Sequence, residues 1–347
     1  MSQYNTISEI RTELKQIPLK TPFITALRRV ENIEFVRVYV ICSNESVGIG
    51  EAPATFAITG ENIETILSSI STIRESLLGL EVGVALEKLH FFSIGSSAKA
   101  SLDMAFMSLI KPFKLLNTMP IKTDITISLN ETKKMLDDAR LAFESGMNIL
   151  KVKLGGDISH SIEVTKLLSK NLPNAKLLID ANQAWSLKES LEYVNAIKDL
   201  KIELIEQPVI ADDLESLKTI TNATSIPILA DEATFTLKDV KKVMQSKSAD
   251  MINIKLMKCG GVSKAIEILE YAREKKIVCM LGSMLEGPYS INAALYLAFN
   301  YRDVVKYVDL DSPLLYKRES SELEFFFRGE SIYSSQSSIS PSSMFSS

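Results

Sequence analysis

The spacing of apolar residues separates an N-terminal part of mixed structure from a longer, more regular C-terminal part. Residues 33–42 begin by alternating apolar and polar side chains and are rich in Val and Ile, which predicts a β-strand. Residues 48–53 contain two glycines and are interpreted as a turn-rich continuation of that strand. A helical period of apolar residues predicts one helix over 61–78, and a second is predicted over 97–110.

Short apolar segments alternate with helical segments from about residue 122 onward. The segments predicted as strands are 123–129, 148–154, 175–180, 202–207, 227–232, 250–256, 279–283 and 306–311. Helices are predicted between several of them, over 131–145, 160–171, 187–199 and 262–276. A βα repeat of this kind builds a parallel sheet, and eight such units predict an α/β fold with a (β/α)8-type barrel.

One polar residue stands near the end of each predicted barrel strand. These residues are Thr126, Lys153, Asp180, Glu206, Asp231, Lys255, Ser283 and Asp309, at intervals of 24 to 28 positions. Active sites of such barrels lie at the C-terminal ends of the strands, so the regular spacing predicts that the eight side chains converge on one mouth. The alternative is that polar residues only mark where each strand leaves for a loop.

Three carboxylates, Asp180, Glu206 and Asp231, close three consecutive predicted strands. Neighbouring strands lie about 4.8 Å apart, so the three charges would repel one another unless a cation lay between them. Oxygen ligands without histidine or thiolate suit Mg²⁺ or Mn²⁺. The alternative is three unrelated acids that each favour a helix N-terminus.

Lysines occupy the strands next to and opposite these acids. Lys151 and Lys153 are two residues apart and therefore share one face of a strand. Lys255 ends the sixth strand, which lies across an eight-stranded barrel from the second. A lysine crowded by another lysine and a divalent cation has its charged form disfavoured and can act as a base. The alternative is a set of surface lysines that extend their ammonium groups into water.

A second pair of acids, Asp309 and Asp311, repeats the two-residue spacing at the last strand. Two carboxylates aimed at the mouth would suit a cationic group of a ligand. The alternative is that they cap the turn that follows.

Composition limits the remaining possibilities. The 347 residues include 43 acidic and 39 basic ones, a net charge of −4, which gives no indication of a nucleic-acid or anionic-membrane partner. Two histidines make a His-rich zinc site improbable. Three cysteines form no disulfide framework, and the polar N-terminus and the absence of a long apolar run favour a cytoplasmic protein. Nine serines among the last 14 residues predict a flexible tail.

Several motifs resemble the muconate lactonizing enzyme subgroup of the enolase superfamily. They are KVK at 151–153, DANQAW at 180–185, EQP at 206–208, ADE at 230–232 and NIKLMKCGG at 253–261. Within that subgroup the chain is most similar to dipeptide epimerases of the L-Ala-D/L-Glu type. The segments that carry this similarity are TALR at 25–28, EAPATFAITGE at 51–61, GSMLE at 282–286 and VDLDSP at 308–313.

The resemblance implies a particular division of the chain. Residues 1–118 would form an α+β capping domain, and residues 119–312 a modified (β/α)7β barrel. Residues 313–347 would return to the capping domain, with residues 331–340 as a strand of the cap in place of part of the flexible tail. The resemblance leaves a homo-oligomer open.

The resemblance also implies a mechanism. Asp180, Glu206 and Asp231 would hold one Mg²⁺, and Lys153 and Lys255 would exchange the α-proton of the C-terminal residue of L-Ala-L-Glu or L-Ala-D-Glu from opposite faces. The metal and Lys151 would stabilise the enediolate. The residues implied in substrate binding are Asp309 and Asp311 for the ammonium group, Arg28 for the glutamate carboxylate, and Thr126, Ser283 and Leu285 along the pocket. Arg29, next to Arg28, leaves that assignment open. The implied role is the recycling of murein peptides.

Two other functions remain possible at this point. One is another enzyme of the subgroup with two lysines, such as an N-succinylamino acid racemase, an o-succinylbenzoate synthase or a muconate cycloisomerase. Their substrates present no free ammonium group, so the pair Asp309 and Asp311 argues against them. The other is a barrel without catalytic activity, against which the complete set of lysines and carboxylates argues.

Overall fold

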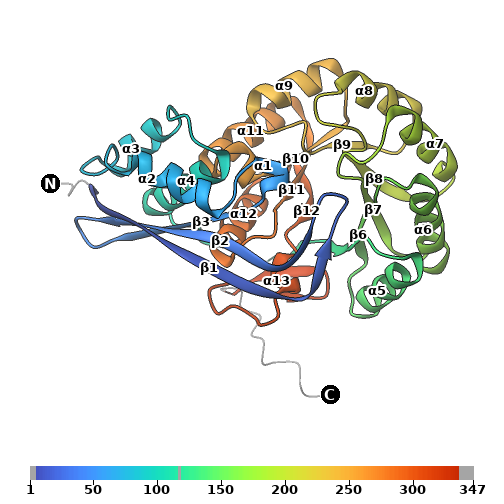
Figure 1. The fold of residues 1–347 in the computed structure, drawn as a ribbon, viewed down its shortest axis with the longest axis horizontal. Helices are drawn as coiled ribbons and strands as arrows, with labels where there is room; N and C mark the ends of the chain where they lie inside the picture. The colour runs from blue at the N-terminus through green and yellow to red at the C-terminus, as the bar shows by residue number, and fades with distance from the viewer. Residues whose placement is uncertain (1–4, 116–118, 336–347) are drawn as a thin grey trace.

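The computed structural model describes residues 5–115 and 119–335 as an antiparallel sheet with helices beside a parallel barrel (Figure 1). The N-terminal sheet has the order β1-β2-β3. Its elements and the helices that accompany it are β1 (Ile7–Ile24), β2 (Arg29–Cys42), β3 (Val47–Pro53), α1 (Phe56–Thr59), α2 (Ile63–Arg74), α3 (Val82–Leu89) and α4 (Ser96–Ile110).

The long strand β1 is absent from the sequence prediction. Its buried positions, among them Ile7, Ile10 and Phe23, are separated by exposed polar residues, and Leu14 is 57% exposed. A strand whose apolar residues are this sparse gives only a weak alternating pattern. Pairing with β2 over most of its length, and not local hydrophobicity, determines its structure.

Residues 48–53 form the strand β3 and not a turn-rich continuation, which corrects the prediction. The two glycines serve a close approach of helix α4. A Cβ added at Gly48 would lie 2.1 Å from the carbonyl oxygen of Ala105, and one at Gly50 would lie 1.9 Å from that of Ser101. Only a residue without a side chain lets the helix pack this closely on the sheet.

The eight predicted barrel strands are all present, and they form one parallel sheet in the order β12-β11-β10-β9-β8-β7-β6-β5. The strands are β5 (Ile125–Ile127), β6 (Ile149–Lys153), β7 (Lys176–Asp180), β8 (Ile202–Glu206), β9 (Ile228–Ala230), β10 (Met251–Lys255), β11 (Val278–Gly282) and β12 (Val305–Asp309). The helices between them are α5 (Thr132–Glu144), α6 (Ile158–Asn171), α7 (Leu187–Ile197), α8 (Leu214–Ala223), α9 (Leu237–Ser246), α10 (Leu256–Cys259), α11 (Val262–Lys275) and α12 (Pro288–Asn300). The predicted (β/α)7β barrel with an α+β cap is confirmed.

Strands β5 and β12 close the barrel through the residues that precede β5. The backbone N–H of Asp124 donates to the carbonyl of Val308 at 3.1 Å. The hydroxyl of Thr123 donates to the same carbonyl at 3.2 Å and accepts a hydrogen bond from the N–H of Leu310 at 3.1 Å. These contacts place the start of β5 beside the end of β12.

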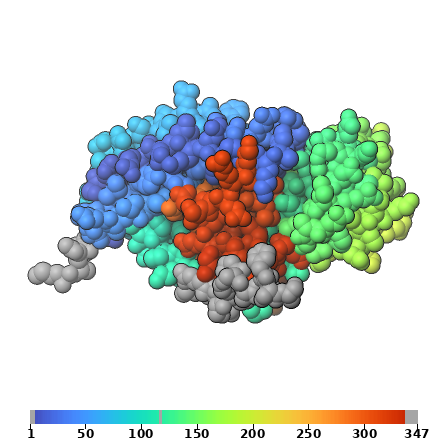
Figure 2. Space-filling model, turned by 90° about the horizontal axis from the view of Figure 1, so that it is seen from below, coloured from blue at the N-terminus to red at the C-terminus, as the bar shows by residue number. Residues whose placement is uncertain are grey.

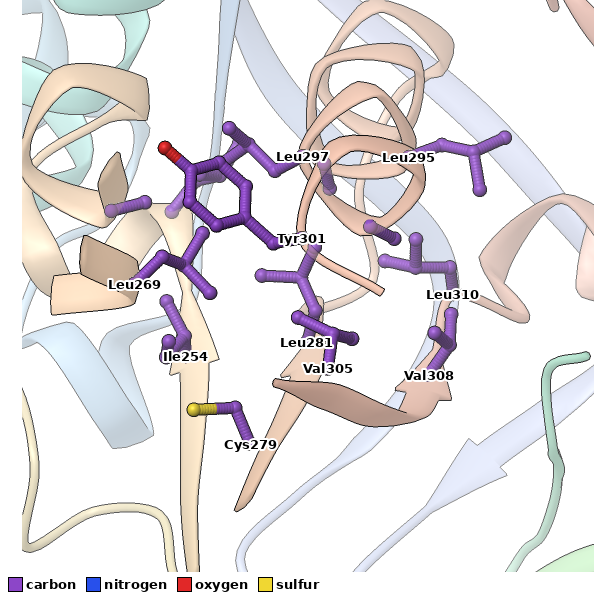
Figure 3. Packing of buried hydrophobic residues seen from close by; sticks show 14 of the residues in the cluster. Ile254, Leu269, Cys279, Leu281, Leu295, Leu297, Tyr301, Val305, Val308 and Leu310 are labelled. Atoms are coloured by element: carbon purple, nitrogen blue, oxygen red, sulfur yellow. The ribbon is translucent and has the colours of Figure 1, made fainter. Parts of the chain in front are cut away.

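The largest apolar core lies between the last barrel strands and the helices α11 and α12 (Figure 3). Ile254, Cys279 and Leu281 face Leu269 and Leu297 across this layer. All three cysteines of the chain are buried free thiols. No helix in residues 5–115 and 119–335 has the length and hydrophobicity that a bilayer span requires.

The segment after the barrel contacts both parts of the molecule, and Figure 2 shows it in orange-red between the blue N-terminal sheet and the green part of the barrel. It contains α13 (Ser312–Leu315), β13 (Phe325–Arg328) and β14 (Ser331–Ser334). The N–H of Lys317 donates to the carbonyl of Pro18 in β1 at 2.8 Å.

The strand expected within residues 331–340 exists, as β14, but it pairs with β13 and with β4 (Ile121–Lys122). It is therefore not part of the sheet β1-β2-β3, which is a correction. Ile332 and Phe325 explain the difference, because both are buried in the core of the barrel. The remaining serine-rich end, residues 336–347, lies outside the described residues.

A buried arginine joins the sheet, the barrel and the C-terminal segment. Arg37 of β2 donates from Nε to Glu51 of β3 at 2.9 Å, and its two Nη atoms contact Glu322 at 2.6 and 2.7 Å. Its guanidinium lies 4.8 Å from the ring centre of Tyr289. Glu51 also accepts a hydrogen bond from the N–H of Ser290 in α12 at 3.1 Å. We refer to Arg37, Glu51 and Glu322 as the junction cluster.

Candidate active site

The ends of the barrel strands bring the predicted acids and lysines into one layer. The parallel register pairs Lys153 with Asp180 and Asp180 with Glu206. Asp231 follows β9 directly, and Lys255 is the last residue of β10. Each of these residues is at most 6% exposed. Strands β6 and β10 are four places apart in the barrel, so Lys153 and Lys255 approach the mouth from opposite walls.

A pocket opens at this mouth, and most of the predicted residues line it. Those that do are Arg28, Thr126, Lys153, Lys255, Ser283, Leu285, Asp309 and Asp311. The other predicted residues, Lys151, Asp180, Glu206 and Asp231, are buried among the strand ends. The expected convergence of the strand ends is therefore present, with a cap loop contributing Arg28.

Four buried acids of the mouth, Asp180, Glu206, Asp231 and Asp309, each lie against a lysine. The ammonium of Lys151 contacts Asp309 at 2.6 Å, Glu206 at 2.7 Å and Asp180 at 3.2 Å. Lys153 donates to Asp180 at 2.5 Å. These contacts join Asp180, Glu206 and Asp309 to the two lysines in one network of opposite charges.

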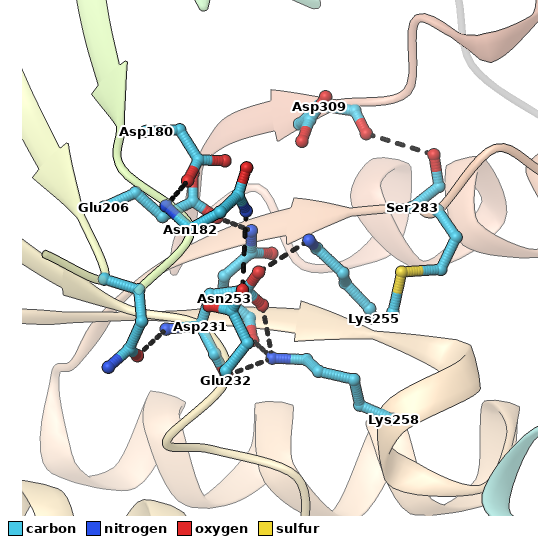
Figure 4. A network of polar contacts seen from close by, with 12 residues as sticks. Asp180, Asn182, Glu206, Asp231, Glu232, Asn253, Lys255, Lys258, Ser283 and Asp309 are labelled. Carbon is cyan, nitrogen blue, oxygen red and sulfur yellow. Dashed lines mark hydrogen bonds and ion pairs between the residues drawn. The ribbon is translucent and has the colours of Figure 1, made fainter. Parts of the chain in front are cut away.

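Asp231 lies between two lysines. Lys255 contacts its Oδ2 at 2.7 Å, and Lys258 contacts its Oδ1 at 2.6 Å (Figure 4). Lys258 also donates to the carbonyl of Asn253 at 2.9 Å. The contacts of Lys258 hold Asp231 in place on the side away from Lys255.

Burial and neighbouring charges shift the pKa values of the lysines and acids at the mouth in different directions. Burial opposes ionisation of Lys255, but the charges of Asp231 and Glu206 outweigh it and raise its pKa. The neighbouring Lys151 acts in the opposite direction and lowers the pKa of Lys255, but the acids of the protein outweigh it. Burial opposes ionisation of Asp180 as well, yet the adjacent lysines hold its pKa at about 2. Burial and the charge of Asp180 raise the pKa of Glu206 to about 7.

Buried oxygens without a hydrogen-bond donor are concentrated at this mouth. Among the described residues they include both carboxylate oxygens of Asp124 and one oxygen each of Asn182, Glu232 and Asn253. The pKa of Glu232 is raised to about 8 by burial and by the charge of Asp231. Acceptors and negative charge thus exceed the donors that the protein provides, which is the environment that a bound cation stabilises.

The donor set of Asp180, Glu206 and Asp231 fits a hard cation such as Mg²⁺. All three are buried carboxylates at the ends of adjacent strands, and the ligands that Mg²⁺ prefers are oxygens. In the described part of the chain, the group of three acids whose oxygens all lie within 4.8 Å of one another is a different one, Asp124, Asp309 and Asp311. Lys151 contacts both Asp180 and Glu206, and Lys255 contacts Asp231.

The pair Asp309 and Asp311 forms an acidic corner beside the end of β5. Asp309 contacts Lys151 through Oδ2, and Asp311 accepts a hydrogen bond from the N–H of Thr126 at 2.7 Å, also through Oδ2. Ser283 donates to the backbone carbonyl of Asp309 from both its N–H, at 3.0 Å, and its hydroxyl, at 3.3 Å. The alternative role of Asp311 as a cap of α13 is not observed, because its side chain makes no capping hydrogen bond there.

Arg28 reaches the pocket from the turn between β1 and β2. The N–H of Thr25 donates to the carbonyl of Arg28 at 3.0 Å, and the N–H of Leu129 donates to Ile24 at 3.0 Å, which attaches the hairpin tip to the barrel. Arg28 is half-buried, and burial lowers its pKa to about 10. Arg29 is exposed and forms a pair with Glu31 at 3.2 Å. Arg28 therefore lines the pocket, whereas the side chain of Arg29 lies in solvent.

Comparisons with known proteins agree with this geometry. A family model described as "Enolase C-terminal domain-like" matches residues 134–333. A protein of Sulfurimonas denitrificans named "L-amino acid-D/L-Glu epimerase" is 57% identical over 333 residues, which are 93% of this chain and 98% of that protein. The chain belongs to the dipeptide epimerases of the enolase superfamily. The resemblance found in the motifs is thereby confirmed.

Solved structures of dipeptide epimerases have the same fold. A substrate-liganded complex of the L-Ala-D/L-Glu epimerase from Bacillus subtilis matches with a TM-score of 0.89 at 36% identity, over 95% of this chain and 96% of that one. A dipeptide epimerase from Enterococcus faecalis, complexed with Mg and the dipeptide L-Leu-L-Tyr, matches with a TM-score of 0.85 at 31% identity, over 90% and 92%.

In this dipeptide epimerase, sequence reasoning missed three ionisable residues at the mouth, Lys258, Asp124 and Glu232. Lys258 lies beyond the strand end, on the short helix α10, so the rule of one polar residue per strand passed over it. Asp124 lies two residues before Thr126 and therefore on the same inward face, a signal that was available. The two histidines lie elsewhere, His90 against Asp103 and Ser263, and His160 in α6.

Proposed function

We propose that the protein is a Mg²⁺-dependent epimerase of L-Ala-Glu-type dipeptides that inverts the Cα of the C-terminal residue by proton transfer between two lysines. The observation that carries this proposal is the placement of Lys153 and Lys255 on opposite walls of one pocket, above a layer of buried carboxylates. A Cα held between them can lose its proton to one face and receive another on the opposite face, which inverts the centre.

Asp180, Glu206 and Asp231 would hold one Mg²⁺ per subunit. When bound, the ion would supply positive charge that stabilises a substrate enediolate and offsets the carboxylates around the lysines. The dipeptide epimerase from Enterococcus faecalis was solved with Mg, which supports this assignment. Lys151, fully buried and within 3.2 Å of both Asp180 and Glu206, would add a fixed positive charge beside the developing negative charge.

The two lysines would perform the proton transfer. General acid–base catalysis contributes about 10²- to 10⁴-fold, which is too little on its own for a proton next to a carboxylate. The remainder would come from electrostatic stabilisation of the negative charge that develops when the proton leaves. Lys258 would keep Asp231 oriented while Lys255 changes its protonation state.

The ends of the pocket match the ends of the dipeptide. Asp309 and Asp311 would bind the N-terminal ammonium group, and Arg28 would bind the side-chain carboxylate of glutamate, for which a guanidinium fork is well suited. Thr126, Ser283 and Leu285 would line the space between these two ends. A substrate of this kind would place the enzyme in the cytoplasm, in the recycling of murein peptides.

An N-succinylamino acid racemase or a related cycloisomerase is less well supported. A buried pair of acids would repel a succinyl carboxylate and would have no ammonium group to bind. A barrel without catalytic activity would not explain why buried lysines and acids surround one pocket.

The test is the incorporation of solvent deuterium at Cα of L-Ala-L-Glu and L-Ala-D-Glu in D₂O with Mg²⁺, followed by mass spectrometry. Lys153→Ala and Lys255→Ala should each abolish interconversion of the two epimers, because each removes one of the two faces of proton transfer. Any residual exchange should be confined to one epimer, and to opposite epimers in the two variants.

A matched control is Lys188→Ala, which removes an exposed lysine from α7 on the outside of the barrel. This variant should retain full exchange. Undiminished interconversion in both Lys153→Ala and Lys255→Ala would reject the mechanism with two bases. Lack of exchange in the wild-type protein with a broad dipeptide library would reject the proposed function itself.

A further inference from the structure

The outer edge of β1 is a feature of the cap that the mechanism above does not use. β1 is an outer strand of the sheet β1-β2-β3 (Figure 1). Its free edge is covered near the two ends of the strand. The N–H of Gly79 donates to the carbonyl of Ile7 at 2.8 Å, and the N–H of Lys317 donates to that of Pro18 at 2.8 Å. Between these two positions, no strand of the described residues pairs with this edge.

The backbone polar groups of the open stretch alternate between the two edges of β1. The strand pairs with β2 without interruption from Glu9 to Pro18, and the carbonyl of Pro18 points away from β2. Because the N–H and C=O groups of every second residue share one direction, those of Ile10, Thr12 and Leu14 also point to the open edge. A row of such unpaired groups is a template for another strand.

The side chains on one face of this stretch alternate in charge. Glu9, Arg11, Glu13 and Lys15 occupy every second position and therefore share one face of β1. Arg11 lies 4.8 Å from the ring centre of Tyr39, and Glu13 contacts Lys15 at 2.6 Å. Glu9 and Arg11 have no ion pair within residues 5–115 and 119–335. The face thus carries both charges in an order that its own reverse can match.

We propose that β1 pairs antiparallel with β1 of a second copy of this chain, about a twofold axis at Thr12. The two three-stranded sheets would then form one continuous sheet. In this register Glu9 of each copy lies opposite Lys15 of the other, and Arg11 lies opposite Glu13. Each charged residue of the face therefore has an opposite charge across the interface, including the two that have no ion pair within one copy. The inference does not depend on the proposed function.

Charge selects this register over its neighbours. A shift of the pairing by two positions preserves the direction of the backbone groups but places like charges opposite each other, which is destabilising. In one direction Glu9 would lie opposite Glu13, and in the other Arg11 would lie opposite Lys15. Charges on an edge strand also serve in many proteins to prevent pairing, and that alternative predicts a monomer. A charge order that matches its own reverse in a single register favours a second copy as the partner.

The opposite face of β1 offers an apolar contact in the same register. Ile10 is 2% exposed in the apolar core of the cap, whereas Leu14, on the same face, is 57% exposed. In the proposed dimer, Ile10 of one copy lies opposite Leu14 of the other. The pairing would therefore extend the apolar layer of each copy over the exposed leucine of its partner and remove that leucine from water.

The first experiment uses the full-length wild-type protein in analytical ultracentrifugation over a range of concentrations, with hydrogen–deuterium exchange of the same samples. We expect a dimer that dissociates on dilution and that about 1 M NaCl weakens, since salt screens exposed charges. The amides of Ile10, Thr12 and Leu14 should exchange more slowly at concentrations at which the dimer is present. A protein that remains monomeric up to roughly 1 mM, or a dimer without this protection, would overturn the proposal.

The second experiment uses two charge reversals that are disruptive alone and complementary together. Arg11→Glu places acids opposite acids in its own dimer, and Glu13→Arg places bases opposite bases. Each variant alone should therefore raise the dissociation constant of the dimer by roughly 10-fold or more. A mixture of the two variants restores opposite charges at every pair across the interface, so a heterodimer should form with an affinity close to that of the wild-type dimer.

Arg140→Glu is the matched control, since it makes the same change of charge at an exposed position of α5. This variant should dimerise as the wild type does. Equal affinities of the wild type and both β1 variants would show that the dimer uses another surface, and a mixture that forms no heterodimer would reject the register at Thr12. If either β1 variant does not fold, the exchange of the wild-type amides decides alone.

Discussion

The mouth of the barrel and the junction cluster both contain buried charged residues, but they differ in how their charges are matched. In the junction cluster, the guanidinium of Arg37 contacts Glu51 and both oxygens of Glu322, and the second oxygen of Glu51 accepts the N–H of Ser290. At the mouth, buried oxygens of Asp124, Asn182 and Glu232 have no donor.

The difference indicates what each group does. A buried ion network whose donors and acceptors are paired holds segments together and has no capacity for a further ligand. A buried network with surplus acceptors has a free energy that a bound cation or ammonium group lowers. Substitutions should therefore affect stability at the junction cluster and activity at the mouth, and the following predictions test this division.

The largest effect is expected for Glu206→Gln at the mouth. In the proposed function this change removes a ligand of Mg²⁺, and a bound metal stabilises developing charge by several kcal/mol, so kcat/KM for L-Ala-L-Glu should fall by about 10³-fold or more. Stability should be unchanged or higher, because a neutral amide relieves the repulsion by Asp180 that helps to raise the pKa of Glu206. Epimerisation assays and thermal unfolding without Mg²⁺ measure the two effects.

Removal of Mg²⁺ with a chelator provides the comparison for that variant. The wild-type protein should lose activity on chelation and regain it when Mg²⁺ is added, whereas Glu206→Gln should respond weakly to the ion. If Glu206→Gln lowered the free energy of unfolding by several kcal/mol, the mouth would be as important for folding as the junction cluster. That result would contradict the division between stability at the junction cluster and activity at the mouth.

The next effect is expected for Arg37→Met in the junction cluster. Removing one partner of a buried ion pair leaves the other charge uncompensated, and Glu51 is completely buried, so the free energy of unfolding should fall by about 3–5 kcal/mol. The kcat and KM of the folded protein should stay within a few-fold of wild type. Chemical denaturation and assays below the unfolding transition measure these quantities.

Arg273→Met is a matched control for Arg37→Met. Two nitrogens of Arg273 also donate to one carboxylate, that of Asp303, and its guanidinium lies 4.4 Å from the ring centre of Tyr301. The side chain of Arg273, however, is 39% exposed. Its loss should cost far less stability, because solvent compensates an exposed pair. Equal destabilisation by both substitutions would show that burial is not the reason for the effect of Arg37.

The contrast between the two regions also explains what the sequence could reveal. The mouth was predictable because each strand of a parallel barrel contributes one end to the same layer, so regular spacing along the chain becomes proximity in space. The lysines of β6 followed from the two-residue period of a strand. Asp124 obeys the same period but was missed, because only one polar residue per strand was considered.

The junction cluster could not be predicted by spacing. Arg37, Glu51 and Glu322 belong to three segments without a common repeat, and the contact between Arg37 and Glu322 spans 285 positions. The strand β1 was missed for a related reason, since its structure depends on pairing with β2 more than on its own apolar pattern. Contacts that depend on how separate units pack leave no periodic signal in the chain.

The smallest effect, and the closest test of the comparison, concerns Arg28→Met. Arg28 has no ion pair or hydrogen bond from its guanidinium among the described residues, so it resembles the mouth and not the junction cluster. The KM for L-Ala-L-Glu should rise by roughly 10- to 100-fold, as expected for the loss of a charge-assisted hydrogen bond to the substrate. The same variant should process L-Ala-L-Met at least as well as wild type does, because this dipeptide has no side-chain carboxylate that would lack a partner in the variant.

Arg29→Met removes the neighbouring guanidinium, which is exposed and paired with Glu31, and provides the control. It should leave the preference between L-Ala-L-Glu and L-Ala-L-Met unchanged, since an exposed pair contributes little and does not face the pocket. A shift in preference by both variants would mean that the positive charge of the turn, and not the position of Arg28, selects glutamate. A shift by Arg28→Met alone would show that an unpaired charge at the mouth is reserved for the substrate.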